Sequence, residues 1–250
     1  MQVTVQALRE VRTKLVLGMT ELEGEALIKA ALAGGGLTSL SAIVLFGANA
    51  ALPHASASAT KRLEAGEFAL FDVGGHLLGY ESDFTRTMLP DSKPAIKGAG
   101  CHSAAAAKLK NEWPSARAEK IWRTVYAAQV AALEAEVNAN TLAGVVSAAS
   151  VDQAARDLIT AEGFGPYFTH RLGHGIGLQV HEAPYLNSGN VDQPINSGVT
   201  HSNEPGIYIE READPEGLGI GVRLEDMVHK TKDGWELLSG SALAVSPWEW

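Results

Sequence analysis

Two aspartates on one expected hairpin constrain the fold of this chain more than any other feature. The stretch 71–87, FDVGGHLLGYESDFTRT, continues an apolar strand and contains three glycines that favour a turn. If Asp72 and Asp83 pair across this hairpin, the turn is centred at 77–78. Neighbouring carboxylates repel each other unless one takes up a proton or a cation lies between them. The hairpin therefore predicts a bound cation.

A second pair of acids shows the same arrangement near the end of the chain. Glu204, in SNEPGIYIE, and Glu225, in GVRLED, flank a polar stretch. A register that places these two acids opposite each other centres the loop on Asp214 and Pro215, and both residue types favour turns. We therefore expect a second hairpin that presents two carboxylates.

Three histidines lie between the two hairpins, in HRLGHGIGLQVHE: His170, His174 and His181. Four carboxylates with one imidazole suit a pair of divalent ions such as Mn²⁺, Co²⁺ or Zn²⁺. The alternating glycines of this segment could instead indicate a nucleotide-binding loop. That interpretation is rejected, because the segment lacks the lysine of a phosphate-binding loop and does not clearly open a helix.

The composition fits one large domain with helices and strands. The 250 residues show no shift in composition that would mark a boundary, and 46% of them are hydrophobic, which suffices for a core. No apolar run is long enough to span a membrane. The net charge of −9 argues against nucleic acid or an anionic membrane as a partner. Charges interrupt the first residues before any signal-peptide core, so we expect a cytoplasmic protein.

Periodicity and capping patterns predict four helices. Apolar residues at helical spacing predict helices over 3–17 and 115–137. Thr20, with a glutamate three residues later, and Ser150, with a glutamine three residues later, have capping-box spacing, so each should begin a further helix. With an apolar strand over 41–46, the two halves repeat the same order of helices, histidine and acidic hairpin, which indicates an internal structural repeat.

Residues 90–113 do not fit this pattern. They have no clear period and predict a surface insertion. Cys101 and His102 lie within it, but two adjacent residues are a weak sign of a metal or redox site, and we interpret the segment as a solvated loop. Cys101 is the only cysteine, so an internal disulfide is excluded.

Four motifs occur in a fixed order: DVGG…GYESDFTRT, GHGIGLQVHE, NEPGIYIE and GVRLED. Together they closely resemble the dinuclear metallopeptidases of the pita-bread fold, in the branch of Xaa-Pro aminopeptidase (aminopeptidase P) and prolidase. The similarity extends from Gly18 to the final strands, except over 90–113. The resemblance implies an α+β fold of two pseudo-symmetric halves, each with helices on a curved, mostly antiparallel sheet. It also implies a single catalytic domain over 1–250, without the N-terminal domain that full-length members usually carry.

The resemblance implies a metal-ligand set. Asp72 would bind one ion, and His174 and Glu204 would bind the other. Asp83 and Glu225 would bridge the two ions. All five positions hold the expected residue type, which argues against the members that have lost their metal ligands. We expect two divalent ions per chain, most of all Mn²⁺, with Co²⁺ or Zn²⁺ as alternatives.

The same match implies roles around the substrate. His54, His170 and His181 would surround the substrate, and His54 and His181 would also take part in catalysis, with His181 donating to the oxyanion. Arg223 would position the acids. Glu204 would take a proton from the metal-activated bridging water and pass it to the leaving nitrogen.

The implied activity is that of a metal-dependent exopeptidase that hydrolyses the Xaa-Pro bond of a proline-containing peptide, as an aminopeptidase or a dipeptidase. A homodimer is compatible with this family. Two other interpretations remain open. The chain could be a pita-bread module that binds peptides or a protein without cleaving them, or a related enzyme, such as a lyase, that uses the same metal site on a non-peptide substrate.

Overall fold

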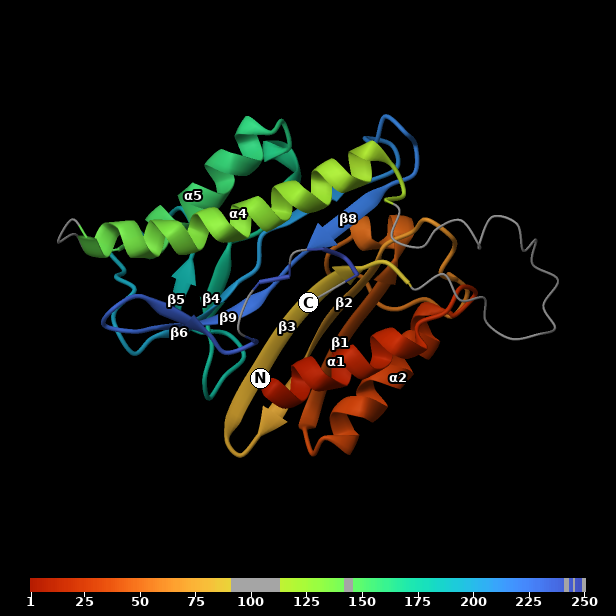
Figure 1. Cartoon of the computed structure of the whole chain (residues 1–250), viewed down its shortest axis with the longest axis horizontal. Coiled ribbons are helices and arrows are strands. Elements are labelled where there is room, and N and C mark those ends of the chain that lie inside the picture. Colours follow the sequence, from red (N-terminus) through yellow and green to blue (C-terminus); the bar gives the residue numbers. More distant parts are fainter. Residues whose placement is uncertain (91–112, 142–145, 241–242, 245, 249–250) are drawn as a thin grey trace.

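The structure is a computed structural model, and it describes residues 1–90, 113–141, 146–240, 243–244 and 246–248. Figure 1 shows two halves, and in each half a pair of helices packs on antiparallel strands. The first half contains α1, α2 and β1 to β3, and the second contains α4, α5 and β4 to β10. Within the described part of the chain, no helix is both long and apolar enough to cross a membrane.

The first half is a three-stranded sheet, in the order β1-β2-β3, covered on one face by two helices. Successive residues of a strand point to opposite faces of a sheet. Phe71 and Val73 pack in the core beneath the helices, so Asp72 between them faces the other side. The elements are α1 (Gln2–Lys14), α2 (Glu21–Gly34), β1 (Thr38–Phe46), η1 (Gly47–Ala51), β2 (Ala69–Leu77) and β3 (Tyr80–Met88).

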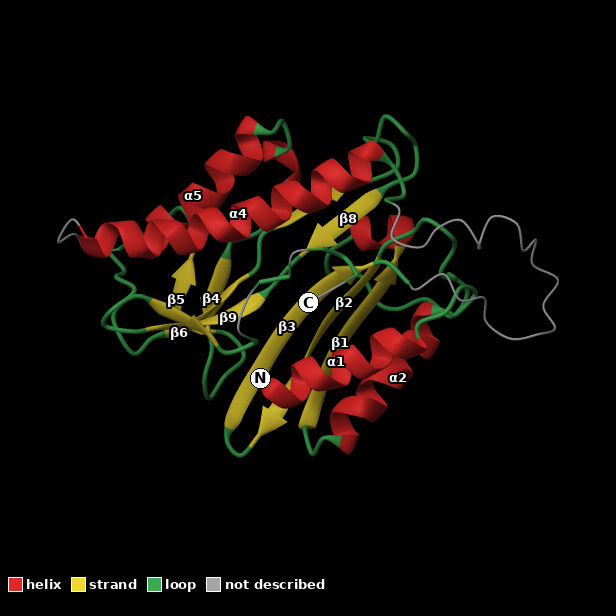
Figure 2. Cartoon of the chain, viewed as in Figure 1, coloured by secondary structure: helices red, strands yellow, loops and turns green. Residues whose placement is uncertain are grey.

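The second half contains a five-stranded sheet, in the order β10-β9-β6-β4-β5, and the separate pair β7-β8. Figure 2 shows the two long helices lying across these strands. The elements are α4 (Ala116–Thr141), α5 (Ala148–Ala161), η2 (Gly165–Tyr167), β4 (Gly173–Gly175), β5 (Glu182–Leu186), β6 (Thr200–Asn203), β7 (Gly206–Ile209), β8 (Ile220–Arg223), β9 (Asp226–Lys230) and β10 (Trp235–Leu237).

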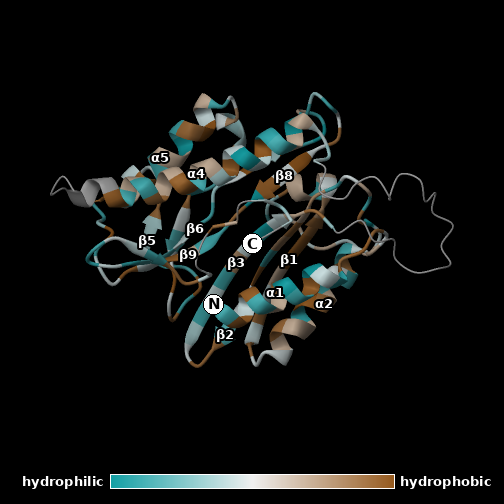
Figure 3. Ribbon diagram, viewed as in Figure 1, coloured by the Kyte–Doolittle hydropathy of each residue, from teal (hydrophilic) through white to brown (hydrophobic). Residues whose placement is uncertain are grey.

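Each half has its own large hydrophobic cluster. The first is built from α1, α2 and the β1–β3 sheet, and the second from α4, α5 and strands of the second half. In Figure 3 the hydrophobic colour follows β1 and β8, whereas α4 carries hydrophobic and hydrophilic patches in alternation. Each large apolar side chain buried in this way contributes about 1.5–3 kcal/mol. The two clusters hold the helices on the outside and leave the acidic strand faces turned inward.

The helix predictions are confirmed except for one N-cap. Thr20 caps α2 in the expected capping box. The helix after it ends at Gly34, and those expected over 3–17 and 115–137 are α1 and α4. The prediction of Ser150 as a cap was wrong. Ser147 caps α5, its hydroxyl accepts the backbone N–H of Ser150, and Ser150 lies in the first turn.

The register predicted for the first hairpin was wrong by two residues. Asp72 pairs with Thr85, and Asp83 pairs with Gly74. The turn lies at Leu78 and Gly79, which both have positive φ (53° and 96°), as a two-residue type I′ turn requires. The two aspartates are therefore diagonal neighbours on one face of the sheet, not direct partners.

The register predicted for the second hairpin is confirmed. Gly206 pairs with Arg223 in β7-β8, and Asn203 pairs with Asp226 in β6-β9. The two pairs follow the same register. Continued through the residues between these strands, that register places Glu204 opposite Glu225.

Only the two ends of the insertion expected over 90–113 lie within the described residues. Residues 91–112, with Cys101 and His102, lie outside the described residues. Trp113 was wrongly assigned to a solvated loop, because its ring centroid is 5.0 Å from that of Trp248 and 5.8 Å from that of Trp122. Its large apolar ring favours this aromatic cluster over water.

The cap assignment makes a stability prediction. Ser147→Ala should lower the free energy of unfolding by about 1 kcal/mol, because it removes the acceptor for an N–H of the first turn. Ser150→Ala is the matched control and should change stability by less than about 0.5 kcal/mol. Urea unfolding of the two variants measures both values. A larger loss for the Ser150 variant would contradict the assignment.

Candidate metal centre

A cleft of about 470 Å³ lies between the inward faces of the two halves. It is lined by strand residues of the first half and by the histidine-rich segment of the second. Eight of the site residues expected from the sequence line this cleft: His54, Asp72, Asp83, His170, His174, His181, Glu204 and Arg223. Glu225 is only 1% exposed and lies among them beneath the surface. The fold thus brings all of these residues together.

The possible ligand atoms form three overlapping groups. Within each group the atoms lie within 4.8 Å of one another. Glu225 belongs to two of these groups. If each of the two groups held its own ion, the carboxylate of Glu225 would contact both ions. The groups are Asp72, Asp83 and Glu225; His174, Glu204 and Glu225; and Asp83, His174 and His181.

The His174 ring is oriented for an interaction through Nε2. Its Nδ1 lies 3.1 Å from the carbonyl oxygen of Gly175, which can only accept, so Nδ1 carries a proton. Its Nε2 lies 3.2 Å from Oε1 of Glu204 and 3.8 Å from Oδ2 of Asp83. A neutral imidazole would turn a lone pair toward two carboxylates. Either a proton or a cation must therefore lie between these groups.

The negative charge of two buried carboxyl groups in the cleft, those of Asp83 and Glu225, is unfavourable. Burial, followed by the charges of Asp72 and Glu204, raises the pKa of Asp83 well above its usual range. Burial, followed by the charge of Asp83, does the same to the pKa of Glu225. In addition, Oε1 of Glu225 is buried and has no hydrogen-bond partner. An acidic, partly unsatisfied oxygen set of this kind fits divalent metal ions.

Glu204 differs from the other acids. Burial favours its protonated form, but the hydrogen bond from His174 and nearby positive charge, including that of Arg223, lower the pKa of Glu204 to about 2. The Ser202 hydroxyl also donates to its Oε1, at 3.1 Å. Glu204 is therefore ionised at neutral pH and able to accept a proton.

A chain of hydrogen bonds connects Arg223 to the cleft histidines. Arg223 donates through Nη2 to Asp72 and through Nη1 to the Tyr208 hydroxyl, at 2.8 Å. Nδ1 of His170 faces the carbonyl oxygen of Arg171, so its Nε2 accepts from the Tyr208 hydroxyl, at 2.8 Å. Burial lowers the pKa of His170, which agrees with a neutral ring. The ring of His54 lies 6.5 Å from that of His170, between centroids.

A buried layer behind the acids holds Glu225 in place. The Thr85 hydroxyl donates to Oε2 of Glu225, at 2.8 Å. Arg86 donates to the carbonyl oxygen of Glu225, at 2.7 Å, and to Oδ1 of Asp226, at 2.8 Å. Gln129 of α4 donates to the other oxygen of Asp226. Residues of β3 in the first half therefore fix an acid of the second half.

Sequence reasoning missed Thr85, Arg86, Tyr208 and Asp226. Period-two spacing could have found one of them. Thr85 lies two residues after Asp83 on β3 and shares its strand face, whereas Tyr208 lies on β7 and Glu204 lies in the link before that strand. The partner of Arg86 lies 140 residues away in the chain, and no local pattern reveals such a contact.

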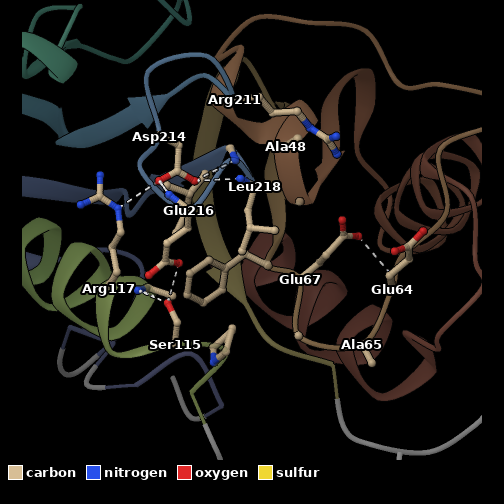
Figure 4. Close-up of a pocket in the computed structure, with 17 residues that line it drawn as sticks. Ala48, Glu64, Ala65, Glu67, Ser115, Arg117, Arg211, Asp214, Glu216 and Leu218 are labelled. Carbon is tan, nitrogen blue, oxygen red and sulfur yellow. Dashed lines mark hydrogen bonds and ion pairs between the residues drawn. The ribbon is translucent and has the colours of Figure 1, made fainter. Parts of the chain in front are cut away.

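A second cavity, of about 330 Å³, contains none of the predicted site residues. It lies beside the β7–β8 loop, and Figure 4 shows Asp214 at its edge. Asp214 pairs with Arg117 at 3.1 Å and accepts the backbone N–H groups of Leu218 and Gly219. This carboxylate closes the loop whose centre was predicted at Asp214 and Pro215.

Comparisons with known proteins identify relatives of this chain. The model of metallopeptidase family M24 matches residues 1–232. An uncharacterized peptidase of Schizosaccharomyces pombe is 41% identical over 226 residues, which are 90% of this chain and 43% of that protein.

Solved structures give the same result. An X-Pro aminopeptidase from Thermotoga maritima is similar with a TM-score of 0.78 and 29% identity, over 98% of this chain and 60% of that one. A Xaa-Pro dipeptidase from Bacillus anthracis has a TM-score of 0.78 and 31% identity, over 98% of this chain and 59% of that one. The expected α+β pita-bread fold and family resemblance are confirmed. The chain spans about half the length of the curated relatives it matches.

The contact between Thr85 and Glu225 makes a prediction about metal affinity. Thr85→Val keeps the shape of the side chain but leaves Oε2 of Glu225 without its donor, so affinity for Mn²⁺ should fall about 10- to 100-fold. Thr85→Ser restores a hydroxyl and should restore the affinity. Calorimetric titration with Mn²⁺ measures all three proteins. Equal affinity of the valine variant and the unmodified protein would contradict this role.

The raised pKa values of Asp83 and Glu225 predict a pH dependence of the metal-free protein. These groups hold protons more tightly when folded, so the folded state binds more protons above the unfolded carboxylate pKa of about 4. The free energy of unfolding should then decrease as pH rises from about 4 through the raised pKa values. Urea unfolding in a chelator at several pH values measures this decline.

Asp83→Asn is the matched variant for this pH series. It removes one of the two groups and should make the decline shallower. Saturating Mn²⁺ should also weaken the decline, because the ions offset the charge in place of protons. Stability that rises over the same pH range in the metal-free protein would contradict the prediction.

Proposed function

The chain belongs to metallopeptidase family M24, and we propose that it is a metal-dependent exopeptidase that hydrolyses the Xaa-Pro peptide bond. One observation carries the proposal. Carboxylates and an imidazole from both halves converge on one cleft, with their ligand atoms within 4.8 Å in overlapping groups. The similarity to an X-Pro aminopeptidase and a Xaa-Pro dipeptidase supports the choice of bond.

Two groups of residues would hold two divalent ions. Asp72 would bind one ion, and His174 and Glu204 would bind the other, while Asp83 and Glu225 would contact both. Asp83 and Glu225 each belong to two of the close groups, as shared ligands would, and so does His174. Carboxylates with one histidine suit Mn²⁺, and Co²⁺ or Zn²⁺ are the alternatives. When bound, the two ions would activate a water molecule for attack and polarise the scissile carbonyl.

The residues of the chain would then handle the protons. Glu204 is ionised at neutral pH, and it would accept the proton of the attacking water and pass it to the proline nitrogen. The proline nitrogen must gain this proton to leave as a neutral amine, because its anion is a very poor leaving group. His181 lines the cleft and is exposed, and it would donate to the developing oxyanion.

Arg223 would hold the acids in place rather than react. It neutralises Asp72 and donates to Tyr208, which in turn donates to His170. With Nδ1 of His170 committed to a backbone carbonyl, the ring has a fixed orientation beside His54. These two histidines would bind the substrate on that side of the cleft.

Metal content and peptide cleavage test the proposal together. Protein loaded with Mn²⁺ should hold about two ions per chain and release proline or a peptide beginning with proline from Xaa-Pro substrates. Asp83→Asn and Glu225→Gln should each lose bound metal and lower kcat/KM about a thousandfold, or ~4 kcal/mol. Elemental analysis and a proline-release assay measure both properties.

The control is Glu212→Gln, an exposed acid outside the cleft. It should retain both metal and activity. Two ions per chain without cleavage of any Xaa-Pro peptide would refute the proposed activity. Full cleavage by the Asp83 and Glu225 variants would refute the assigned ligands.

A further inference from the structure

Helix α4 buries an acid that the proposed mechanism does not use. Glu136 lies in the last turns of α4 and is fully buried. Its Oε1 lies 3.2 Å from Nε2 of His201 on β6, which is also fully buried. Among the described residues, neither carboxylate oxygen of Glu136 has another hydrogen-bond partner. A buried carboxylate is costly unless a proton or a positive charge lies beside it, so Glu136 depends on His201.

The orientation of the His201 ring shows where a proton must lie. Nδ1 of His201 is 2.9 Å from the carbonyl oxygen of Ser202, which can only accept, so Nδ1 carries a proton. Nε2 then faces Glu136 either with a second proton or with a lone pair. Two unprotonated acceptors 3.2 Å apart in a buried site would repel each other. The imidazole and the carboxylate therefore share one proton between Nε2 and Oε1.

A second charged group, Lys230 of β9, also acts on His201. Lys230 is 2% exposed, and its Nζ donates to the backbone carbonyl oxygen of Glu136, at 3.0 Å. Gly175, the partner of His201 on β4, has no side chain, and the neighbours of His201 on β6 are uncharged. Burial and the charge of Lys230 lower the pKa of His201, but the Glu136 carboxylate outweighs both, so the net effect raises it. The shared proton is therefore held firmly.

Strand β6 connects this pair to the candidate metal centre. Successive residues of a strand point to opposite faces, so His201 reaches α4 on one side and Ser202 reaches the cleft on the other. The Ser202 hydroxyl accepts the backbone N–H of His174, at 2.9 Å, and donates to Oε1 of Glu204, at 3.1 Å. The position of β6 therefore sets the placement of two candidate metal ligands.

Helix α4 holds β6 at a second point, two turns earlier. Gln129 donates to the carbonyl oxygen of Asn203, at 3.1 Å, and the side-chain amide of Asn203 donates to the carbonyl oxygen of Gln129, at 2.9 Å. Neither of these groups titrates. Of the two contacts, only the one between Glu136 and His201 depends on a proton.

We propose that Glu136 and His201 are a positioning pair, whose shared proton holds α4 on β6 and so keeps Ser202 against His174 and Glu204. The inference concerns the metal centre on which the proposed function rests, and it makes metal affinity sensitive to pH. When the proton leaves, a buried carboxylate faces a lone pair, α4 and β6 separate, and the Ser202 hydroxyl loses its position. The pair contributes fully below about pH 6.5, where an unfolded histidine is also protonated, and its contribution is lost as pH rises through the raised pKa of His201.

The first test is urea unfolding in a chelator between about pH 6 and about pH 9, a range that spans the pKa of an unfolded histidine. The comparison is with the double variant Glu136→Leu/His201→Leu, because two apolar side chains replace a buried pair with little loss of stability. The unfolding equilibrium constant of the unmodified protein should rise up to about tenfold more per pH unit than that of the double variant, since one proton is released. Asp83 and Glu225 are present in both proteins, so their effects cancel. A ratio that does not change with pH would overturn the proposal.

The second test observes the ring of His201 directly and requires no unfolding. Nitrogen-15 NMR of zinc-loaded protein identifies the His201 signals by their absence from the double variant. At pH ~7 the ring should carry protons on both nitrogens, whereas in Glu136→Leu it should carry one, because burial then acts without the carboxylate. A ring that titrates near its usual pKa of about 6.5 in the unmodified protein would overturn the proposal.

Metal affinity separates a positioning pair from one that only stabilises the fold. At pH ~7, Glu136→Leu should bind Mn²⁺ about tenfold more weakly in calorimetric titration, as losses behind metal ligands do. The double variant restores a contact between α4 and β6 and should regain the affinity. The affinity of the unmodified protein, divided by that of the double variant, should fall between about pH 7 and about pH 9. Equal affinity of Glu136→Leu and the unmodified protein would overturn the positioning role.

The matched control is His229→Gln, which removes a partly exposed histidine of β9 that contacts Thr200. It should change neither the metal affinity nor the pH dependence of unfolding. None of these measurements needs peptide cleavage. If they agree with the pair but no Xaa-Pro peptide is cleaved, the proposed function fails and the pair remains. If Xaa-Pro peptides are cleaved but the double variant binds Mn²⁺ as weakly as Glu136→Leu, the pair fails and the proposed function remains.

Discussion

Repulsion among buried carboxylates is the constraint on which the rest of this structure depends. Asp72, Asp83, Glu204 and Glu225 converge with ligand atoms within 4.8 Å in overlapping groups. Two like charges about 4 Å apart repel by ~4 kcal/mol at an effective dielectric constant of ~20. Among the described residues of the cleft, only Arg223 forms an ion pair with one of these acids without depending on a protonated histidine. The folded acids therefore need protons or metal ions.

The site exists only where the two halves join. The first half supplies two aspartates, and the second supplies His174 and two glutamates. Hydrogen bonds cross this junction from Thr85, Arg86 and Thr87 to residues 223–226. The pair between Arg86 and Asp226 is almost fully buried, and such pairs repay little more than their own desolvation. The main effect of this ion pair is on geometry, because Arg86 holds the backbone that carries Glu225 beside the other acids.

The sequence predicted the members of the site better than their exact partners. The register of the first hairpin was wrong by two residues, because nothing in the sequence indicates that Leu78 adopts a positive φ. A shift of two residues keeps every side chain on its own face of the sheet, whereas a shift of one would have turned Asp72 toward the helices. Asp72 and Asp83 therefore still share one face of the sheet despite the error in pairing.

Other features could not be predicted, because they depend on contacts between distant segments. Tyr208 matters through its position between Arg223 and His170. The sequence does not show that Nε of Arg171 lacks an acceptor in the described part of the chain, because this depends on where the fold places the acids of the cleft. The cap of α5 was misplaced because Ser147 and Ser150 have similar local propensities, and packing of the helix selects between them.

The two arginines of the cleft differ in their contacts, because Arg223 donates to Asp72 and Tyr208 whereas Nε of Arg171 has no hydrogen-bond acceptor among the described residues. Arg223 is paired with Asp72 and donates to Tyr208. If two divalent ions are bound, their four positive charges equal the charge of the four central carboxylates, Asp72 included, and the charges of Arg171 and Arg223 are then in excess. Without the ions, both arginines face a cluster of negative charge. Metal binding would therefore change the sign of the charge in the cleft, from an excess of carboxylates to an excess of positive charge.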